Sequence, residues 1–237
     1  MSEIPTAWQD EEIARIYIEE RRAAVPFGAE MLTVVEQILG WFQPKVQSIL
    51  DIGTGDGFFT QVVLKHYPDA HATLVDHSQP MLNRARANLA GLGERITYLE
   101  ADLGNSLSEL VPVGSIDLVI SRFAIHHLPD DRKHTLYGEI FDALRPGGWF
   151  LHNEHVTSAS PRLESLCDSI FIDRISTRTG RARSMVSDEF YGRLDRLDNK
   201  LASVETQVGQ LRELGFEQVD CYFKWLELAV FGGCKPQ

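Results

Sequence analysis

Three glycines at alternate positions follow an apolar segment and an aspartate early in the chain. The segment reads Ser48-Ile-Leu-Asp-Ile-Gly-Thr-Gly-Asp-Gly-Phe58, so Gly53, Gly55 and Gly57 stand between a strand pattern and a helix pattern. Glycine is needed where a backbone turns sharply or where a ligand must approach main-chain atoms closely. Because a plain turn needs fewer glycines, this spacing favours a loop that binds a nucleoside-type ligand.

The spacing of these glycines excludes the commonest phosphate-binding loops. A dinucleotide-binding loop has the pattern G-x-G-x-x-G/A, which requires glycine or alanine at the position that Phe58 occupies. A P-loop requires Gly-Lys-Ser/Thr, which does not follow here. With no pyrophosphate-binding pattern, we expect a nucleoside ligand that carries no phosphate.

Acidic residues stand at the ends of the first three strand patterns. Asp51 precedes the glycines, and Asp76 follows it by 25 residues (76 − 51) at the end of the next pattern. A carboxylate at that second position can accept hydrogen bonds from both ribose hydroxyls. Asp102, after the third pattern, suits an exocyclic adenine amine. Such acids also occur as helix caps or in turns, so they indicate a nucleoside site only in combination with the glycine loop.

Two adjacent histidines, His126 and His127, follow the fourth strand pattern and are the candidates for catalytic proton transfer. Histidine suits a general base near neutral pH. Neighbouring side chains generally point in different directions, so at most one of the two is expected to face a site. The alternative is that His127 caps or packs the loop before the next helix.

Four further residues are candidates for contact with a substrate. In His152-Asn-Glu-His155, strand alternation puts Asn153 and His155 on the face opposite to His152, so the two histidines do not converge and we expect no metal. Arg21 belongs to an N-terminal helical pattern. Arg174 belongs to a run of arginines, which fits either a solvated surface or a lid that attracts an anionic substrate.

Short β-branched segments that alternate with helical patterns must position these residues. The expected strands are Val46–Ile52, Ala72–Asp76, Ile96–Glu100, Ile116–Ser121, Trp149–His155, Gln218–Leu228 and Ala229–Lys235. The expected helices between them are Phe58–His66, Pro80–Leu89, Arg132–Leu144 and Val204–Leu214. This alternation predicts a doubly wound α/β fold with a mostly parallel sheet, and the last two strands are expected to form an antiparallel hairpin.

Two helical segments lie outside that alternation. Residues 1–45 are expected to form an N-terminal helical cover, and residues 157–200 a helical lid inserted in a Rossmann-like domain of residues 46–237. Both adjoin strand ends that face the ligand crevice of such a fold. The lid carries two apolar stripes, the second formed by Phe190, Leu194, Leu197 and Leu201. That second stripe suits either a cover over the crevice or the seam of a homodimer.

Composition restricts the partners of the chain. It has 237 residues, of which 43% are hydrophobic, and a net charge of −11, which disfavours broad contact with DNA, RNA or an anionic membrane. No signal-peptide pattern or membrane-spanning run is present, and three cysteines without metal-like spacing fit a reducing compartment. We therefore expect a cytoplasmic protein with a small-molecule substrate and no DNA or membrane partner.

The motifs, taken in order, resemble those of class I S-adenosylmethionine-dependent methyltransferases of the small-molecule type. The matching segments are Asp51-Ile-Gly-Thr-Gly-Asp-Gly57, Val75-Asp76, Glu100-Ala-Asp102, Asp117-Leu-Val-Ile-Ser121 and Leu144-Arg-Pro-Gly-Gly-Trp149. The resemblance implies a seven-stranded, mostly parallel sheet of order 3-2-1-4-5-7-6 with the last strand antiparallel, here with helical lid additions. It also implies S-adenosyl-L-methionine as the cofactor and S-adenosyl-L-homocysteine as its product.

The resemblance implies roles for residues in the first two motifs. Asp51 would bind toward the methionine amino group, while Gly53 and Gly55 let the loop pass beside the cofactor. Asp76 would take the ribose hydroxyls, and His77 would stack on the adenine.

It also implies roles for residues further along the chain. Asp102 and the backbone of Leu103 would read the adenine. Ser121, through its carbonyl, and Phe123 would lie beside the methionine and the sulfonium. Tyr17, on the N-terminal helix, would close over the cofactor unless it is a core tyrosine.

The leading hypothesis is a methyltransferase that acts on a small molecule by in-line displacement at carbon. The alternatives are a methyltransferase acting on RNA or protein, and a nonenzymatic protein that binds S-adenosylmethionine. After Ser121 the chain has Arg-Phe-Ala rather than the Pro-Pro-aromatic pattern typical of amino methylation on nucleic-acid bases. The motifs do not distinguish O-, N-, S- or C-methylation.

Overall fold

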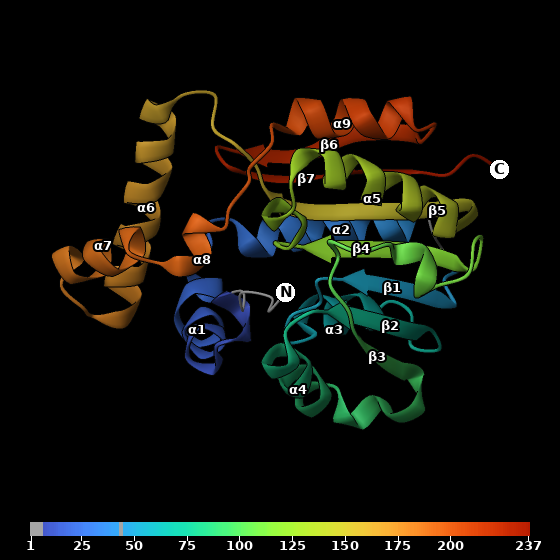
Figure 1. The fold of residues 1–237 in the computed structure, drawn as a ribbon, viewed down its shortest axis with the longest axis horizontal. Helices are drawn as coiled ribbons and strands as arrows, with labels where there is room; N and C mark the ends of the chain where they lie inside the picture. Colours follow the sequence, from blue (N-terminus) through green and yellow to red (C-terminus); the bar gives the residue numbers. More distant parts are fainter. Residues whose placement is uncertain (1–6, 43–44) are drawn as a thin grey trace.

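The computed structural model describes residues 7–42 and 45–237, and Figure 1 shows their fold. One sheet contains β1 (Ser48–Ile52), β2 (His71–Asp76), β3 (Ile96–Glu100), β4 (Ile116–Arg122), β5 (Leu144–His155), β6 (Glu217–Trp225) and β7 (Leu228–Cys234). The strand order is β3-β2-β1-β4-β5-β7-β6. The strands β3, β2, β1, β4 and β5 are parallel to one another, and β7 is antiparallel to both its neighbours, β5 and β6. The predicted doubly wound α/β fold, strand order and antiparallel last strand are confirmed.

The central strands are apolar on both faces because helices cover both. In β1, Ile49, Leu50 and Ile52 are almost fully buried, as are Leu118 and Val119 in β4. Continuous apolar runs of this kind are typical of parallel strands between two helical layers. Polar residues are therefore concentrated where each strand ends, and the chemistry is concentrated there too.

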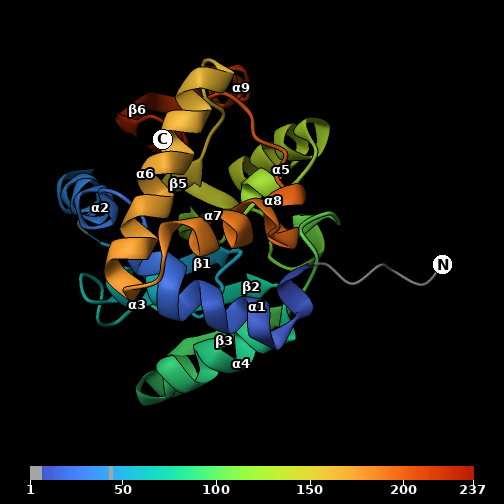
Figure 2. The same cartoon turned by 90° about the vertical axis from the view of Figure 1, so that its left-hand side faces the viewer.

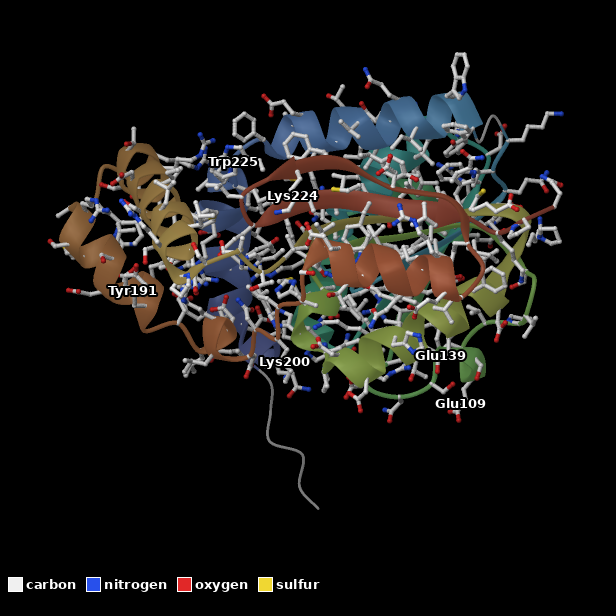
Figure 3. All side chains as sticks on the ribbon, turned by 90° about the horizontal axis from the view of Figure 1, so that it is seen from above. Glu109, Glu139, Tyr191, Lys200, Lys224 and Trp225 are labelled. Carbon is white, nitrogen blue, oxygen red and sulfur yellow. The ribbon has the colours of Figure 1, made fainter. Side chains whose placement is uncertain are left out.

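Two helical layers enclose the sheet. On one face lie α2 (Gly28–Phe42), α3 (Phe58–Leu64) and α4 (Gln79–Asn88), and on the other lie α5 (Asp130–Ala143) and α9 (Val204–Glu213). Figure 3, seen along the sheet, shows α2 and α9 on opposite sides of β6 and β7. The sequence pattern did not single out α2 as a separate helix. None of the helices in the described ranges has both the length and the hydropathy that a membrane crossing needs.

The expected N-terminal cover divides into two parts with different positions. The first consists of η1 (Ala7–Gln9), α1 (Glu11–Ile16), a π-helical turn η2 (Tyr17–Arg21) and η3 (Arg22–Ala24), with Asp10 capping α1. This part packs against α4 and the lid helices. The second part, α2, packs on the sheet against β7 and β6, so it belongs to the layer that covers the sheet. Residues 1–6 and 43–44 of the expected cover lie outside the described residues.

The lid segment forms α6 (Pro161–Thr179), α7 (Arg183–Tyr191) and α8 (Leu194–Leu197). Figure 2 shows these helices beside α1, in front of the sheet. The second predicted apolar stripe is not a continuous buried face: Phe190 is buried, but Leu194 is 62% exposed and Leu197 is 74% exposed. The stripe is divided between two helices, because α7 ends at Tyr191 and α8 begins at Leu194.

Candidate functional site

The glycine loop turns tightly at the end of β1. Gly53, Gly55 and Gly57 all have positive φ, between 56° and 77°, a region that other residues rarely adopt. The backbone N–H of Gly53 donates to the Val75 carbonyl at 2.8 Å. A Cβ on Gly53 would lie 2.1 Å from the Cβ of Ala124, whereas a Cβ on Gly55 would meet no atom within 4 Å. The loop is therefore pressed against the end of β4 at Gly53 and faces open space at Gly55.

The two strand-end acids nearest the loop are buried and differ in their partners. Asp76 accepts hydrogen bonds from the backbone N–H groups of Gly55 and Ser78, both at 2.8 Å, and burial raises its pKa. Asp51 accepts from the hydroxyls of Thr54 at 2.8 Å and Thr60 at 2.6 Å through one oxygen. Its other oxygen is buried and has no partner among the described residues. Burial raises the pKa of Asp51 to about 6.

A first cavity of about 180 Å³ opens over the glycine loop. Eight of the predicted cofactor residues line it: Tyr17, Gly53, Gly55, Asp76, His77, Asp102, Leu103 and Phe123. Asp51 and Ser121 do not, because they lie beneath the loop and the strand ends, where the Ser121 hydroxyl donates to the Ile52 carbonyl at 2.8 Å. The role predicted for Ser121 uses its backbone carbonyl.

A second cavity of about 120 Å³ lies next to the first and is lined in part by residues of segment 157–200, the predicted lid. Trp8, Tyr17, Phe123 and His127 line both cavities. The lid contributes Cys167, Asp168, Phe171, Phe190, Arg193, Asp195, Arg196 and Asn199 to the second cavity. Arg196 pairs with Asp168 at 2.8 Å and so fastens α8 to α6.

The end of the lid is tied to the two histidines. The backbone N–H of Lys200 donates to the His126 carbonyl at 2.8 Å, and its ammonium donates to the His127 carbonyl at 3.0 Å. Lys200, labelled in Figure 3, lies where the chain passes from the lid toward α9. The loop after β4 and the lid therefore hold each other in place.

His126 and His127 have different partners and so different chemistry. Nδ1 of His126 bonds to Oε1 of Glu154 at 2.6 Å, and His126 lines only the second cavity. Nε2 of His127 accepts from the indole N–H of Trp8 at 3.1 Å. Burial lowers the pKa of both histidines, so both are neutral near pH 7. His126 is thus a base held in one orientation, while one nitrogen of His127 is already occupied.

Glu154 organises the residues behind the second cavity. It is 1% exposed and accepts from the backbone N–H groups of His126 (2.9 Å) and His155 (2.7 Å), and it bonds to Nε2 of His152 at 2.8 Å. Its histidine neighbours hold the pKa of the carboxyl well below its ordinary value, against the effect of burial. Glu154 is therefore an anion beneath the imidazole of His126.

The predicted substrate residues fall in different places. His155 lines the second cavity and bonds to Glu227 at 3.1 Å. Arg21 pairs at 3.2 Å with Asp195, which lines that cavity, but Arg21 itself does not.

The other two predicted substrate residues line neither cavity. Arg174 is exposed and donates to the Ala24 carbonyl at 2.8 Å, which ties α6 to the N-terminal segment. Asn153 is completely buried. Within the described residues, no group of three side chains is arranged to hold a metal ion.

Four residues at the site were not predicted in the positions that they occupy. Trp8, Arg22 and Arg122 line the first cavity, and Glu154 supports His126. Arg122 directly follows Ser121 in the fourth motif, so its position at a strand end was the available signal. No pattern indicated a role for Trp8, whose hydrogen bonds are with Ser78 and His127, far along the chain.

Comparisons with known proteins agree with this geometry. A family model described as a methyltransferase domain matches residues 49–148. A carboxy-S-adenosyl-L-methionine synthase of Aeromonas salmonicida is 24% identical over 221 residues, which span 91% of this chain and 85% of that protein. Another of the same name from Desulforapulum autotrophicum is 25% identical, spanning 99% of this chain and 93% of that protein.

Solved structures show the same fold. Human N-acetylserotonin methyltransferase in complex with S-adenosylmethionine matches with a TM-score of 0.63 and 17% identity, over 97% of this chain and 58% of that one. Phosphoethanolamine N-methyltransferase 2 of Haemonchus contortus, in complex with S-adenosylhomocysteine, matches with a TM-score of 0.63 and 17% identity, over 96% and 58%. The chain therefore carries a methyltransferase domain, and its strand order and glycine loop are those expected of class I S-adenosylmethionine-dependent methyltransferases. It is an enzyme of the transferase class that uses this cofactor.

The residues of the first cavity fit that cofactor. The open space beside Gly55 lets a ligand lie directly on the backbone. The unpartnered oxygen of Asp51 is an acceptor suited to an ammonium group, whether directly or through a water molecule. Asp76 and Asp102 provide further acceptors in the cavity wall.

Proposed function

We propose that the protein transfers a methyl group from S-adenosylmethionine to a small molecule held in the second cavity. When bound, the cofactor supplies an electrophilic methyl group on a positively charged sulfur. The observation that carries the proposal is that the two cavities adjoin, with Trp8, Tyr17, Phe123 and His127 in the walls of both. A molecule in the second cavity therefore lies next to one in the first.

On the cofactor side, the residues bind and orient. Asp76 holds the ribose hydroxyls, with His77 and Leu103 beside the adenine and Asp102 accepting from its amine. Support comes from the position of all four in the wall of one cavity. Holding two reacting groups in line contributes about 7–11 kcal/mol to lowering the barrier of such a reaction.

On the acceptor side, His126 takes the proton that the acceptor loses. Nδ1–H of His126 stays bonded to Glu154, so Nε2 is the nitrogen that receives the proton from an acceptor O–H or N–H group. The Glu154 carboxylate then stabilises the imidazolium that forms. Neutral His126 at pH 7 supports this role, since a protonated imidazole cannot act as a base.

The lid and the N-terminal segment exclude water from the reacting groups. Phe171 and Phe190 from the lid and Trp8 from the N-terminal segment line the second cavity. An apolar enclosure of this kind keeps the acceptor in place and keeps bulk water from competing with it.

The test is a labelling experiment. The full chain is incubated with methyl-labelled S-adenosylmethionine and a fractionated metabolite extract, and labelled products are identified by mass spectrometry. We expect label in a small molecule, and a loss of about 10²–10⁴-fold in rate for His126→Gln. His134→Gln, at an exposed position on α5, is the matched control and should keep full activity.

Two outcomes would contradict the proposal. Label in RNA or protein would favour a macromolecular acceptor, and binding of cofactor without any transfer would favour a nonenzymatic protein.

The curated relatives suggest a second candidate function, since they align with nearly the whole chain and are named for making carboxy-S-adenosyl-L-methionine. In that case a cofactor-derived product heavier by carbon dioxide would appear in the same spectra.

A further inference from the structure

Arg122 is a partly buried cation without an anionic partner. It ends β4 and lines the first cavity, with its guanidinium 4.6 Å from the ring centre of Phe123 and 5.3 Å from that of Phe58. Its Nε–H is buried and has no hydrogen-bond partner among the described residues. An enclosed N–H donor on a charged side chain is costly when it has no acceptor.

The charged groups around Arg122 do not supply that acceptor. Asp56 acts on Arg122 electrostatically, but both its oxygens accept from Arg22 Nη1, at 2.7 and 2.6 Å. Tyr17 offers a neutral hydroxyl beside the guanidinium. Arg22, Asp56 and Arg122 together leave one net positive charge at this end of the cavity.

Acidic residues of the first cavity lie at or just after the ends of β2 and β3, which lie on the other side of β1 from β4 and Arg122. Asp76 and Asp102 lie there with His77, where the nucleoside is proposed to bind. The cavity therefore runs from acidic groups, which suit hydroxyls and amines, to an unpaired guanidinium, which suits a carboxylate. S-Adenosylmethionine has the same polarity, with a nucleoside at one end and an amino-acid carboxylate at the other.

The geometry points to Arg122 as the residue that binds the carboxylate of the cofactor and so selects donors that carry an intact amino-acid end. This role rests on the proposed binding of S-adenosylmethionine in the first cavity. It differs from the role of Arg22, whose charge Asp56 already neutralises.

A structural role is the rival explanation. Asn153 is the register partner of Arg122 on β5, is completely buried, and has no partner for either amide atom among the described residues. A rotation of Asn153 could bring its oxygen to Arg122. In that case Arg122 would stabilise the fold and would not contact the cofactor.

The two roles are separated by calorimetry with two ligands. S-Adenosylhomocysteine has the amino-acid end, and 5′-methylthioadenosine has the same nucleoside and sulfur without it. For the full chain carrying Arg122→Met, we expect affinity for S-adenosylhomocysteine to fall about 10- to 150-fold, the value of a hydrogen bond to a charged group. Affinity for 5′-methylthioadenosine should not change. Arg86→Met, which removes an arginine stacked on Tyr98 outside the cavity, is the matched control and should leave both affinities as they are.

The outcomes distinguish this inference from the proposed function. Undiminished binding of S-adenosylhomocysteine by Arg122→Met, with or without a lower Tm, overturns the role of Arg122 and leaves the cofactor site intact. Failure of the wild-type chain to bind either ligand overturns the cofactor site itself. If Arg122→Met does not fold, the wild type is tested with a decarboxylated analogue of S-adenosylhomocysteine that keeps the amino group. That analogue should bind at least tenfold more weakly than the parent, and equal binding refutes the inference.

Discussion

Replacing Glu154 by glutamine should destabilise the protein even though the two side chains have nearly the same shape. Each carboxylate oxygen of Glu154 accepts one backbone N–H, from His155 at Oε1 and from His126 at Oε2. In glutamine one of those oxygens becomes an NH₂ group, so in either orientation one buried backbone N–H faces a donor. An unsatisfied buried N–H costs about 1–3 kcal/mol. Adding the weaker bond to His126, we expect the free energy of unfolding to fall by about 2–4 kcal/mol.

The matched control is Glu227→Gln, at another buried carboxylate. Glu227 bonds to the His155 ring at 3.1 Å and the Ser158 hydroxyl at 2.7 Å, and both of these partners can exchange donor and acceptor roles. Its replacement should therefore cost less than that of Glu154 when both are measured by urea denaturation. Equal losses in the two variants would refute the reasoning from backbone donors.

The stability of the wild type and of Glu154→Gln can also be compared as a function of pH. The pKa of Glu154 is well below its ordinary value of 4.5 in the folded state. Its stabilising effect is therefore complete above pH 4.5 and is lost as pH falls through the folded pKa. The difference in stability between wild type and Glu154→Gln should shrink on acidification below 4.5, and a constant difference would show that the charge of Glu154 is not involved.

Three further results are expected. Gly53→Ala should lower the free energy of unfolding by about 2–4 kcal/mol, because its Cβ would clash with Ala124 in addition to straining φ. Gly55→Ala should lower it by only about 1–2 kcal/mol, because its Cβ would meet open space. The two variants are compared by chemical denaturation. Burial and the neighbouring His126 hold the pKa of His127 well below 6.5, so the folded state favours the neutral ring and loses stability as pH falls below 6.5. The Tm of His127→Gln should therefore depend less on pH in that range than the Tm of His134→Gln. Amide hydrogen exchange in residues 157–200 should slow when S-adenosylhomocysteine binds, because those residues line the second cavity, which shares four wall residues with the first; equal exchange in both states would argue against a lid.

The glycine loop and the sheet could be predicted from the sequence because their determinants are local. Positive φ at Gly53, Gly55 and Gly57 leaves few alternatives to glycine, and the apolar runs of the parallel strands are short and bounded by polar residues. The strand-end acids Asp76 and Asp102 follow from the same pattern, since parallel strands end at one edge of the sheet. Together with the residues that the family resemblance implied, they make up the eight predicted cofactor residues that line one cavity.

The acceptor side could not be predicted in the same way because its contacts join distant segments. Nothing local distinguishes His126 from His127; the difference comes from Glu154, 28 residues beyond His126, and from Trp8, 119 residues before His127. Asn153 occupies a strand end, as expected, yet its side chain is enclosed rather than facing a cavity. Strand alternation predicts that Asn153 and His152 lie on opposite faces of the sheet, but it does not predict which elements cover each face.

With the acceptor in the second cavity, as proposed, substrate choice is determined mainly by the parts that lie outside the sheet. The glycines and acids of the first cavity lie at or just after the ends of strands β1 to β3, which the fold itself brings together. The second cavity takes most of its walls from the N-terminal segment and the lid, which are joined to each other by Arg21 and Asp195 and to the histidines by Lys200. Changes in those segments can alter the shape of the second cavity while the glycine loop and Asp76 stay in place. An acceptor must then be sought from the walls of the second cavity, because a cofactor site on the same sheet is compatible with many acceptors.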